Sequence, residues 1–318
     1  MPRALLLDAY RRTGADPPFG DPRRGHGIEL EGYYWRLTDP AAGRVVIAIG
    51  AVCVGPAGPW GLVVLASHPG GHVRWAQTET AHADPTRLGV VAGHALSASA
   101  EGLRIDLGPD ARLDVRFAER HDWPRRAFGA LGPAHALPGL PQYWHPHMFG
   151  ASVQGEATLG GERVDLAGAT AYAEKNWGPS FSDHWWWGQA QGFEDPEACV
   201  AFAGGRIELA GVAAAPTALV LCLGGELLRF SPPFSRMTAA VGEAGWRVAA
   251  RSARHRVELE GEEAGHAPVL LPVPVPAERR VEVRSRQHLA GRVRVRVLRS
   301  GRTVFEGESV LAGLERWV

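Results

Sequence analysis

The stretch GRVRVRVLRSGRTVFEG, residues 291–307, carries the clearest structural signal in the sequence. Arg292, Arg294 and Arg296 alternate with three valines, so an extended strand here has one polar face and one apolar face. A Ser-Gly pair at 300–301 marks a turn, and a second strand-like run follows it. The stretch predicts an antiparallel β-hairpin. We interpret its arginine row as a solvated sheet face, in preference to a site for a polyanion.

Short apolar runs of strand length recur along the whole chain. Examples are RVVIAIGAVCV, GLVVLAS, GLRIDLG and TALVLCL. The 40 glycines and 24 prolines of the sequence separate these runs, which is the pattern of strands joined by turns. A helical period is suggested only over residues 3–13. The sequence therefore predicts an all-β protein.

An internal repeat orders these strands. GYYWRLTDPAAGRVVIAIG (32–50) matches HWWWGQAQGFEDPEACVAFAGG (184–205), because each has an aromatic triplet, an Asp-Pro turn and a small-residue apolar strand. A second match, without gaps, joins GERVDLAGATAYAEKNW (161–177) to GRTVFEGESVLAGLERW (301–317). Two similar all-β units predict two tandem antiparallel β-barrels, since closure of a sheet removes its exposed edges.

The start and end markers of the repeat also predict how the chain divides. We expect an N-terminal extension over residues 1–26, a first β-barrel over 27–180 and a second β-barrel over 181–318. Each unit is long enough to build a hydrophobic core of its own.

Composition argues against several classes of function. The sequence has 34 Lys and Arg against 34 Asp and Glu, so no net charge draws it to nucleic acid. Three scattered cysteines, Cys53, Cys199 and Cys222, indicate a reducing compartment rather than a disulfide framework. No apolar run has the length of a signal peptide or a membrane-spanning helix. We expect a soluble, cytoplasmic protein.

The sequence also lacks the usual cofactor motifs. Its glycine-rich stretches GPAGPWG and AFAGGR lead into no predicted helix, so they are read as turns rather than phosphate loops. His145 and His147 alternate like a pair of metal ligands on a strand, but no third ligand clusters with them. We expect neither a metal nor any other cofactor.

Lys175 and Asn176 are the only lysine and the only asparagine in the chain. A sequence that avoids both residue types elsewhere suggests a position that Arg, Gln or Asp cannot fill. We expect Asn176 to form side-chain hydrogen bonds with backbone groups at a turn, because an amide both donates and accepts. We expect Lys175 to pair with a carboxylate or with carbonyls, as a compact ammonium fits where a guanidinium does not.

The stretch AYAEKNWGPSFSDHWWWGQAQGF (171–193) combines polar and aromatic side chains at the boundary between the two repeats. On a strand, Tyr172, Glu174 and Asn176 point to one face, whereas Lys175 and Trp177 point to the other. In the alternative, purely structural interpretation, Trp177 closes one end of the first barrel and Glu174 forms an ion pair at the rim.

Three segments resemble the tocopherol cyclase-like family: EGYYWRLTDP (31–40), AYAEKNWG (171–178) and SFSDHWWWGQAQGF (180–193). Members of that family carry an EGWY-type opening and an EKxWG…FPxxWxWxQ-type centre. Ser182 is a departure, since the family usually has proline there. The resemblance implies two lipocalin-like β-barrels, as in the more distant carotenoid 1,2-hydratases and the lipocalin-like Diels–Alderases.

The resemblance also implies a proton donor. The hydratases carry a Tyr-x-Asp-x-Asn pattern whose acid protonates an isoprenoid double bond, and this chain has Tyr172, Glu174 and Asn176 in that pattern. Protonation of an alkene creates a carbocation, so the acid must be neutral and shielded from water. A carboxyl group in an apolar barrel has a raised pKa, and aromatic faces stabilise the cation.

We therefore expect a cofactor-independent cyclase that adds the oxygen of a prenylated phenol or quinol to a side-chain alkene and closes a chromanol-type ring. Glu174 is the expected general acid. Tyr172 and Asn176 are expected to assist it as polar neighbours. His145 and His147 are candidate bases for the phenol, and Asp183 is an alternative acid. The expected substrate-binding residues are aromatic, with one amide: Trp177, Trp185, Trp187, Tyr33, Trp35, Trp144 and Gln189.

Two other functions remain open on the sequence alone. In an isoprenoid hydratase, water captures the cation instead of the phenol. In a lipocalin-like carrier, the barrel simply holds one hydrophobic molecule. For all three, the expected partner is a hydrophobic small molecule, with no nucleic acid and no obligate protein partner. Substrate uptake through peripheral contact with a membrane is compatible with each.

Overall fold

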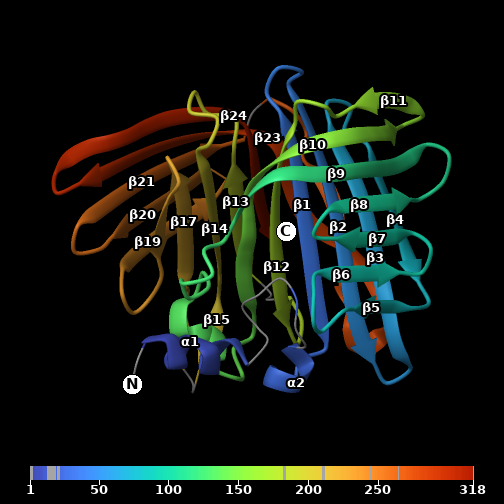
Figure 1. The fold of residues 1–318 in the computed structure, drawn as a ribbon, viewed down its shortest axis with the longest axis horizontal. Coiled ribbons are helices and arrows are strands. Elements are labelled where there is room, and N and C mark those ends of the chain that lie inside the picture. The colour runs from blue at the N-terminus through green and yellow to red at the C-terminus, as the bar shows by residue number, and fades with distance from the viewer. Residues whose placement is uncertain are drawn as a thin grey trace.

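The computed structural model describes most of the chain: residues 3–12, 19, 22–181, 184–209, 212–243, 245–263 and 265–317. Two large antiparallel β-sheets, each curled into a nearly closed barrel, lie side by side (Figure 1). The predicted all-β class and the two tandem antiparallel barrels are confirmed.

The first barrel is a sheet of twelve strands. Its order is β4-β3-β2-β1-β12-β10-β9-β8-β7-β6-β5, with β11 beside β10. The strands are β1 (Leu30–Asp39), β2 (Arg44–Gly55), β3 (Gly58–His68), β4 (Val73–Thr78), β5 (Ala81–Ala83), β6 (Gly89–Ala92), β7 (Leu96–Ser99), β8 (Gly102–Asp106), β9 (Ala111–Asp122), β10 (Tyr143–Leu159), β11 (Glu162–Asp165) and β12 (Thr170–Gly178).

The second barrel is a sheet of ten strands. Its order is β18-β17-β14-β13-β24-β23-β21-β20-β19, with β22 beside β23. The strands are β13 (Trp185–Ala190), β14 (Cys199–Gly205), β17 (Thr217–Leu223), β18 (Glu226–Phe230), β19 (Arg236–Gly242), β20 (Gly245–Arg251), β21 (His255–Glu262), β22 (Val269–Val275), β23 (Arg280–Arg299) and β24 (Arg302–Trp317). A separate hairpin joins β15 (Ile207–Leu209) to β16 (Val212–Ala214).

Helices are short in the described chain. They are α1 (Arg3–Arg11), α2 (Pro22–His26) and two 3-10 turns, η1 (Gly132–Ala136) and η2 (Pro276–Glu278). The helix suggested by the sequence near the N-terminus is present as α1. None of the described helices is long and apolar enough to span a bilayer.

In the predicted hairpin over 291–307, the end of β23 pairs with the start of β24, and Arg299 and Arg302 form the pair next to the turn. Val293, Val295 and Val297 are buried in the second barrel. Arg294 is half exposed and forms an ion pair with Glu308. The arginine row is therefore a solvated face, as the alternation predicted.

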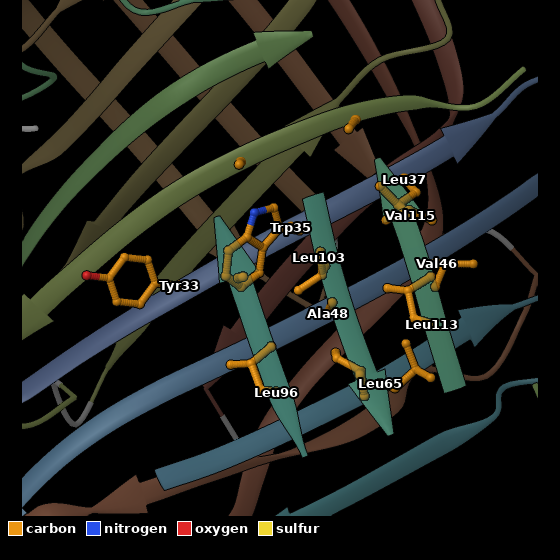
Figure 2. Close-up of a cluster of buried hydrophobic side chains, with 14 of the residues drawn as sticks. Tyr33, Trp35, Leu37, Val46, Ala48, Leu65, Leu96, Leu103, Leu113 and Val115 are labelled. Carbon is orange, nitrogen blue, oxygen red and sulfur yellow. The ribbon is translucent and has the colours of Figure 1, made fainter. Parts of the chain in front are cut away.

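The interior of the first barrel is apolar. Tyr33, Trp35 and Leu37 project from β1 toward side chains of the strands opposite, including Leu96 and Leu103 (Figure 2). Alternate residues of one strand share this interior because side chains on a strand point to opposite faces in turn.

The other face of β1 and β12 packs against the second barrel. Tyr34 and Tyr172 belong to a buried cluster that also contains Trp187 of β13 and Leu311 of β24. Every residue of β1 is buried as a result. A strand that is buried on both faces lies between two cores, one inside its own barrel and one between the barrels.

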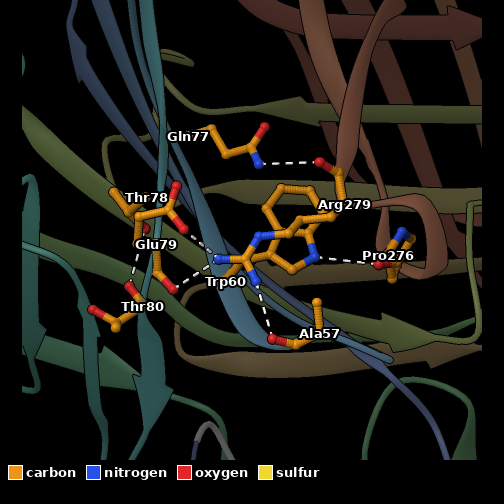
Figure 3. Close-up of polar contacts among 8 residues, drawn as sticks. All are labelled: Ala57, Trp60, Gln77, Thr78, Glu79, Thr80, Pro276 and Arg279. Atoms are coloured by element: carbon orange, nitrogen blue, oxygen red, sulfur yellow. Dashed lines mark hydrogen bonds and ion pairs between the residues drawn. The ribbon is translucent and has the colours of Figure 1, made fainter.

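Polar contacts at one end of this interface also join the barrels (Figure 3). Arg279, between η2 and β23, donates to the carbonyl of Ala57 over 3.2 Å and forms a 2.6 Å ion pair with Glu79. Trp60 of β3 donates its indole N–H to the carbonyl of Pro276 over 3.2 Å. These contacts hold the second barrel against the turns of the first.

The internal repeat is right in topology but wrong in register. In each sheet the first strand lies between the second and the last: β1 between β2 and β12, and β13 between β14 and β24. The gapless match equates Glu174 with Leu314. However, Leu314 belongs to the core of the second barrel, whereas Glu174 faces the space between the barrels. A slip of one residue reverses the faces of a strand.

Strands of the first sheet run from residue 30 to 178 and those of the second from 185 to 317. The division into an extension and two folding units at 26/27 and 180/181 stays a prediction, because sheet membership does not show which segments fold alone.

Candidate active site

A cavity of about 300 Å³ lies between the two barrels, and both contribute to its walls. Its lining is predominantly apolar and aromatic, with two carboxyl groups. The first barrel supplies Tyr34, Leu62, Trp144, Glu174 and Asn176. The second barrel supplies Trp185, Trp187, Leu271, Ser285 and Glu315.

Glu174 on β12 is 3% exposed, and its oxygen Oε2 accepts three hydrogen bonds. Tyr172 donates its hydroxyl over 2.6 Å, and the indole N–H groups of Trp144 and Trp187 donate over 2.8 and 3.0 Å. No donor in the described part of the chain binds Oε1. The carboxyl group is therefore held in place through Oε2. When the group is protonated, the proton is on Oε1.

Burial raises the pKa of Glu174 from its ordinary value to about 7. The donors Tyr172, Trp187 and Trp144 act in the opposite direction, because they stabilise the charged form. The nearby carboxyl of Glu315 raises the pKa further. A substantial fraction of Glu174 is thus protonated at neutral pH, which is what a general acid requires.

Glu315 on β24 is the second carboxyl of the cavity and is not among the predicted site residues. Its Oε1 accepts the indole N–H of Trp185 over 2.7 Å. Burial raises its pKa, while the neighbouring hydroxyl of Ser285 and the hydrogen bond from Trp185 lower it. The internal repeat held the signal for this residue, but the one-residue slip placed a core leucine at the position that matches Glu174.

Aromatic rings form the wall beside these carboxyls. The rings of Tyr34 and Trp187 meet edge to face with centroids 5.0 Å apart, and those of Phe181 and Trp185 are 5.3 Å apart. The Tyr34 hydroxyl accepts a 3.3 Å hydrogen bond from Gln287, and burial raises the pKa of Tyr34 to about 12. Tyr34 is consequently a neutral phenol in the cavity wall.

The structure brings together part of the predicted site. Trp144, Trp185 and Trp187 line the cavity with Glu174, and Tyr172 lies directly behind that carboxyl. The predicted alternation of faces on β12 is confirmed for this group, because residues two apart share the interbarrel side.

Three predicted substrate-binding residues do not line this cavity. Tyr33 and Trp35 point into the first barrel, and Trp177 stacks on Tyr143 with centroids 5.3 Å apart. Each lies one residue away in sequence from a cavity residue, so strand alternation turns it to the opposite side. The packing of Trp177 agrees with the alternative interpretation, in which this ring closes one end of the barrel.

The two histidines proposed as bases are also apart from the cavity. His145 contacts the ring of Trp123 with centroids 4.7 Å apart. Neither ring nitrogen of the buried His147 has a hydrogen-bond partner among the residues that the structure describes. Burial lowers the pKa of His145 well below its usual value and that of His147 to about 3. Within the described residues, no group of three or more potential metal ligands includes them.

Gln189, another predicted substrate-binding residue, does not line the cavity either. Gln189 is buried between the sheets, where its amide lies 3.6 Å from the sulfur of Cys199. Asp183, the alternative acid, lies outside the residues that the structure describes, as does Ser182.

Lys175 is fully buried and forms an ion pair with Glu31, with Nζ 3.2 Å from Oε2. Its ammonium also lies over the rings of Tyr33 and Trp177, 5.7 and 5.3 Å from their centroids. The prediction that Lys175 pairs with a carboxylate is confirmed. The ion pair lies on the barrel side of β12, opposite Glu174.

The prediction for Asn176 is wrong for its side-chain oxygen. Oδ1 is buried without a hydrogen-bond partner in the described structure. The amide instead borders the cavity and packs on Gly32, where an added Cβ would lie 2.4 Å from Oδ1. Glycine on β1 therefore makes room for this amide.

A cavity between two antiparallel barrels, with a buried carboxyl held by indole and phenol donors, agrees with the family resemblance of the sequence. A model of the tocopherol cyclase-like family matches residues 120–316, which is more than half of the chain. The chain belongs to that family.

Individual relatives are distant. The chloroplastic tocopherol cyclase of Zea mays is 28% identical over 144 residues, which are 44% of this chain and 30% of the maize protein. The chain thus aligns with less than a third of the length of the curated plant relatives it matches.

Solved structures share the fold over nearly the whole chain. Kievitone hydratase from Nectria haematococca has a TM-score of 0.54 at 11% identity, covering 96% of this chain and 91% of that one. CghA, solved with Sch210972, has a TM-score of 0.59 at 14% identity, covering 92% and 88%. The TM-scores and the coverage show that both proteins share the fold of this chain.

Proposed function

We propose that the protein is an acid-catalysed cyclase, which adds the hydroxyl of a prenylated phenol or quinol to a side-chain alkene and closes a chromanol-type ring. The observation that carries this proposal is the environment of Glu174: a buried carboxyl whose pKa is raised to about 7 and which faces an aromatic cavity. A carboxylic acid supplies the proton, so the reaction needs no cofactor.

The first step is proton transfer from Oε1 of Glu174 to one carbon of the alkene. Because three donors occupy Oε2, the proton on Oε1 is directed away from them. The same donors stabilise the carboxylate that forms. Its negative charge and the faces of Trp185 and Trp187 then stabilise the tertiary cation, and each aromatic face contributes up to about 2 kcal/mol when desolvated.

The dimensions of the cavity favour a compact substrate. A volume of about 300 Å³ is at the lower end of the range for small-molecule sites, roughly 300–1,000 Å³. An aromatic ring with a short prenyl chain suits this volume, whereas a long isoprenoid tail needs more room. We propose a short-chain prenylated phenol as the substrate class.

Exposed apolar side chains support peripheral contact with a membrane during substrate uptake. Leu137, Phe234 and Leu270 are 58%, 65% and 51% exposed. Leu137 and Phe234 are close in sequence to Leu140 and Pro232, which line the cavity, whereas Leu270 lies on the face of β22 opposite its cavity-lining neighbour Leu271. Exposed apolar side chains such as Leu137 and Phe234 are suited to contact with lipid.

The test is incubation of the purified protein with short-chain prenylated phenols in D₂O, followed by mass spectrometry. A cyclase gives an isomeric product that carries one solvent deuterium, because the proton of Glu174 exchanges with solvent between turnovers. A product that gains one molecule of water identifies a hydratase. Unchanged ligand that remains bound identifies a carrier and contradicts the proposal.

A further inference from the structure

Glu315 is a partly buried carboxyl that takes no part in the proton transfer proposed for Glu174. It lines the same cavity as Glu174 and comes from the last strand of the second barrel, whereas Glu174 comes from the last strand of the first. In register, Glu315 lies opposite Trp187 on β13, and Glu174 lies opposite Tyr34 on β1. The two barrels thus present one carboxyl each from matching strands.

The surroundings of Glu315 fix its position without neutralising its charge. Trp185 donates to Oε1 over 2.7 Å. The side chain of Gln287 is its cross-strand neighbour on β23. Arg316 follows Glu315 in the sequence, and Arg286 lies opposite Arg316 on β23. Both arginines form ion pairs with Glu263. His288 pairs with the same glutamate over 3.0 Å. No cation in the described residues forms an ion pair with Glu315.

The other ionisable groups near the cavity cannot serve as a base at neutral pH. Tyr34 is neutral, because burial raises its pKa to about 12, and burial raises the pKa of Tyr172 well above its usual value. Arg36 is buried behind Tyr34 and donates to the carbonyls of Leu289 and Leu311 over 2.5 and 2.6 Å. Both proposed histidines face away from the cavity. Glu315 is the remaining acceptor for a proton in the described cavity wall.

We propose that Glu315 is the catalytic base of the cavity, which takes the proton of the attacking hydroxyl while Glu174 supplies a proton to the alkene; this assignment rests on the proposed function. Two interacting carboxyls in one apolar site do not both ionise readily, so one protonated and one ionised group is the favoured state. That state provides an acid and a base at the same pH.

The proton balance closes without any co-reactant. The alkene π pair takes the proton from Oε1 of Glu174, leaving a carboxylate and a tertiary cation. A lone pair of the hydroxyl oxygen forms the new C–O bond, and the O–H proton goes to the carboxylate of Glu315. The alkene has then gained one C–H and one C–O bond, with no net redox change. Proton exchange with solvent after product release restores both groups.

The test compares Glu315→Gln with the matched control Glu308→Gln, an exposed glutamate on the same strand. We expect kcat of Glu315→Gln to fall at least ~10²-fold with little change in KM, the loss typical of a missing general base. The control should keep the wild-type rate. Melting temperatures of both variants establish that each is folded.

The pH profile separates a base from a merely structural residue. In the wild type, kcat should fall at low pH as Glu315 gains a proton and at high pH as Glu174 loses one. Glu315→Gln should lack the acid limb. Its alkaline limb should move to lower pH, because the carboxyl that raises the pKa of Glu174 is gone. A structural role would lower stability but leave the acid limb in place.

If Glu315→Gln does not fold, Trp185→Phe tests the same point, because it keeps the carboxyl and removes its donor. The acid limb should then move to higher pH, since the hydrogen bond from Trp185 lowers the pKa of Glu315. A wild-type rate and an unchanged acid limb in these variants overturn the assignment of Glu315. A wild-type protein that converts no prenylated phenol overturns the proposed function itself, and the assignment with it.

Discussion

Trp187 of the second barrel donates its indole N–H to the carboxyl of Glu174 in the first barrel, over 3.0 Å. The candidate acid is thus held partly by its own barrel, through Tyr172 and Trp144, and partly by the other. The geometry of the site depends on the docked pair of barrels. A substitution in either barrel is therefore expected to change the acidity of Glu174.

Replacing Trp187 by phenylalanine should raise the pKa of Glu174. The indole N–H stabilises the charged carboxylate, so its loss favours the protonated form. Because catalysis needs the proton, the alkaline limb of the rate profile should move upward by about one pH unit, the size expected for a hydrogen bond to a charged group. The measurement is kcat against pH.

The matched control is Trp123→Phe. The indole of Trp123 donates to the carbonyl of Phe128 over 3.2 Å and does not reach the carboxyl. This variant should keep the wild-type alkaline limb. Equal profiles for the Trp187 variant and this control would show that the indole N–H of Trp187 does not tune the acid.

The pH dependence of stability tests Glu174 without any substrate. Its pKa is about 7 in the folded protein, above the ordinary value of 4.5 that applies in the unfolded chain. Its stabilising contribution is therefore full below about pH 4.5 and is lost as pH rises through about 7. The difference between these two pKa values corresponds to about 3 kcal/mol of unfolding free energy. Glu174→Gln cannot titrate and should lack this loss.

We therefore expect the free energy of unfolding of Glu174→Gln, relative to wild type, to increase by about 3 kcal/mol between pH ~4.5 and ~8. Urea titrations at several pH values measure this difference, in which the titrations common to both proteins largely cancel. The exposed control Glu308→Gln should show no such gain. A difference that does not vary with pH would mean that folding does not raise the pKa of Glu174.

Replacing Lys175 by methionine should destabilise the protein by about 3–5 kcal/mol, because it leaves the buried carboxylate of Glu31 without its partner. The double variant with Glu31→Gln should recover part of this loss. Urea denaturation of the three variants forms the cycle. The exposed Arg294→Met variant, which breaks the ion pair with Glu308, should cause no comparable loss. A similarly small effect at Lys175 would contradict the structural role of the buried pair.

Much of the fold could be predicted from the sequence, because strand alternation and turn residues are local signals. The hairpin at 291–307 and the shared face of Tyr172 and Glu174 follow from a period of two alone. Alternation also predicted that Lys175 and Trp177 face the opposite side. The period gives two faces for each strand, however, and does not say which of them lies inside the barrel.

That ambiguity explains the errors in the site. Both faces of β1 and β12 are buried, so hydrophobicity could not show whether Tyr33 or Tyr34 faces the cavity. Glu315 was missed because the repeat was aligned without gaps, and a slip of one residue exchanges the two faces. The histidines were selected for their chemistry, while their distance from Glu174 depends on the path of β10. A cavity between two barrels is a property of their docking, which local patterns do not encode.

The most direct test of the central claim is turnover by Glu174→Gln with a short-chain prenylated phenol on which the wild type is active. The amide keeps the shape of the side chain and an oxygen that can accept from Tyr172, Trp144 and Trp187, so the variant should fold and bind substrate normally. We predict that kcat falls at least ~10²-fold, the lower end of the contribution of a positioned general acid. Near-normal turnover by the folded variant would contradict the role of Glu174 as the acid.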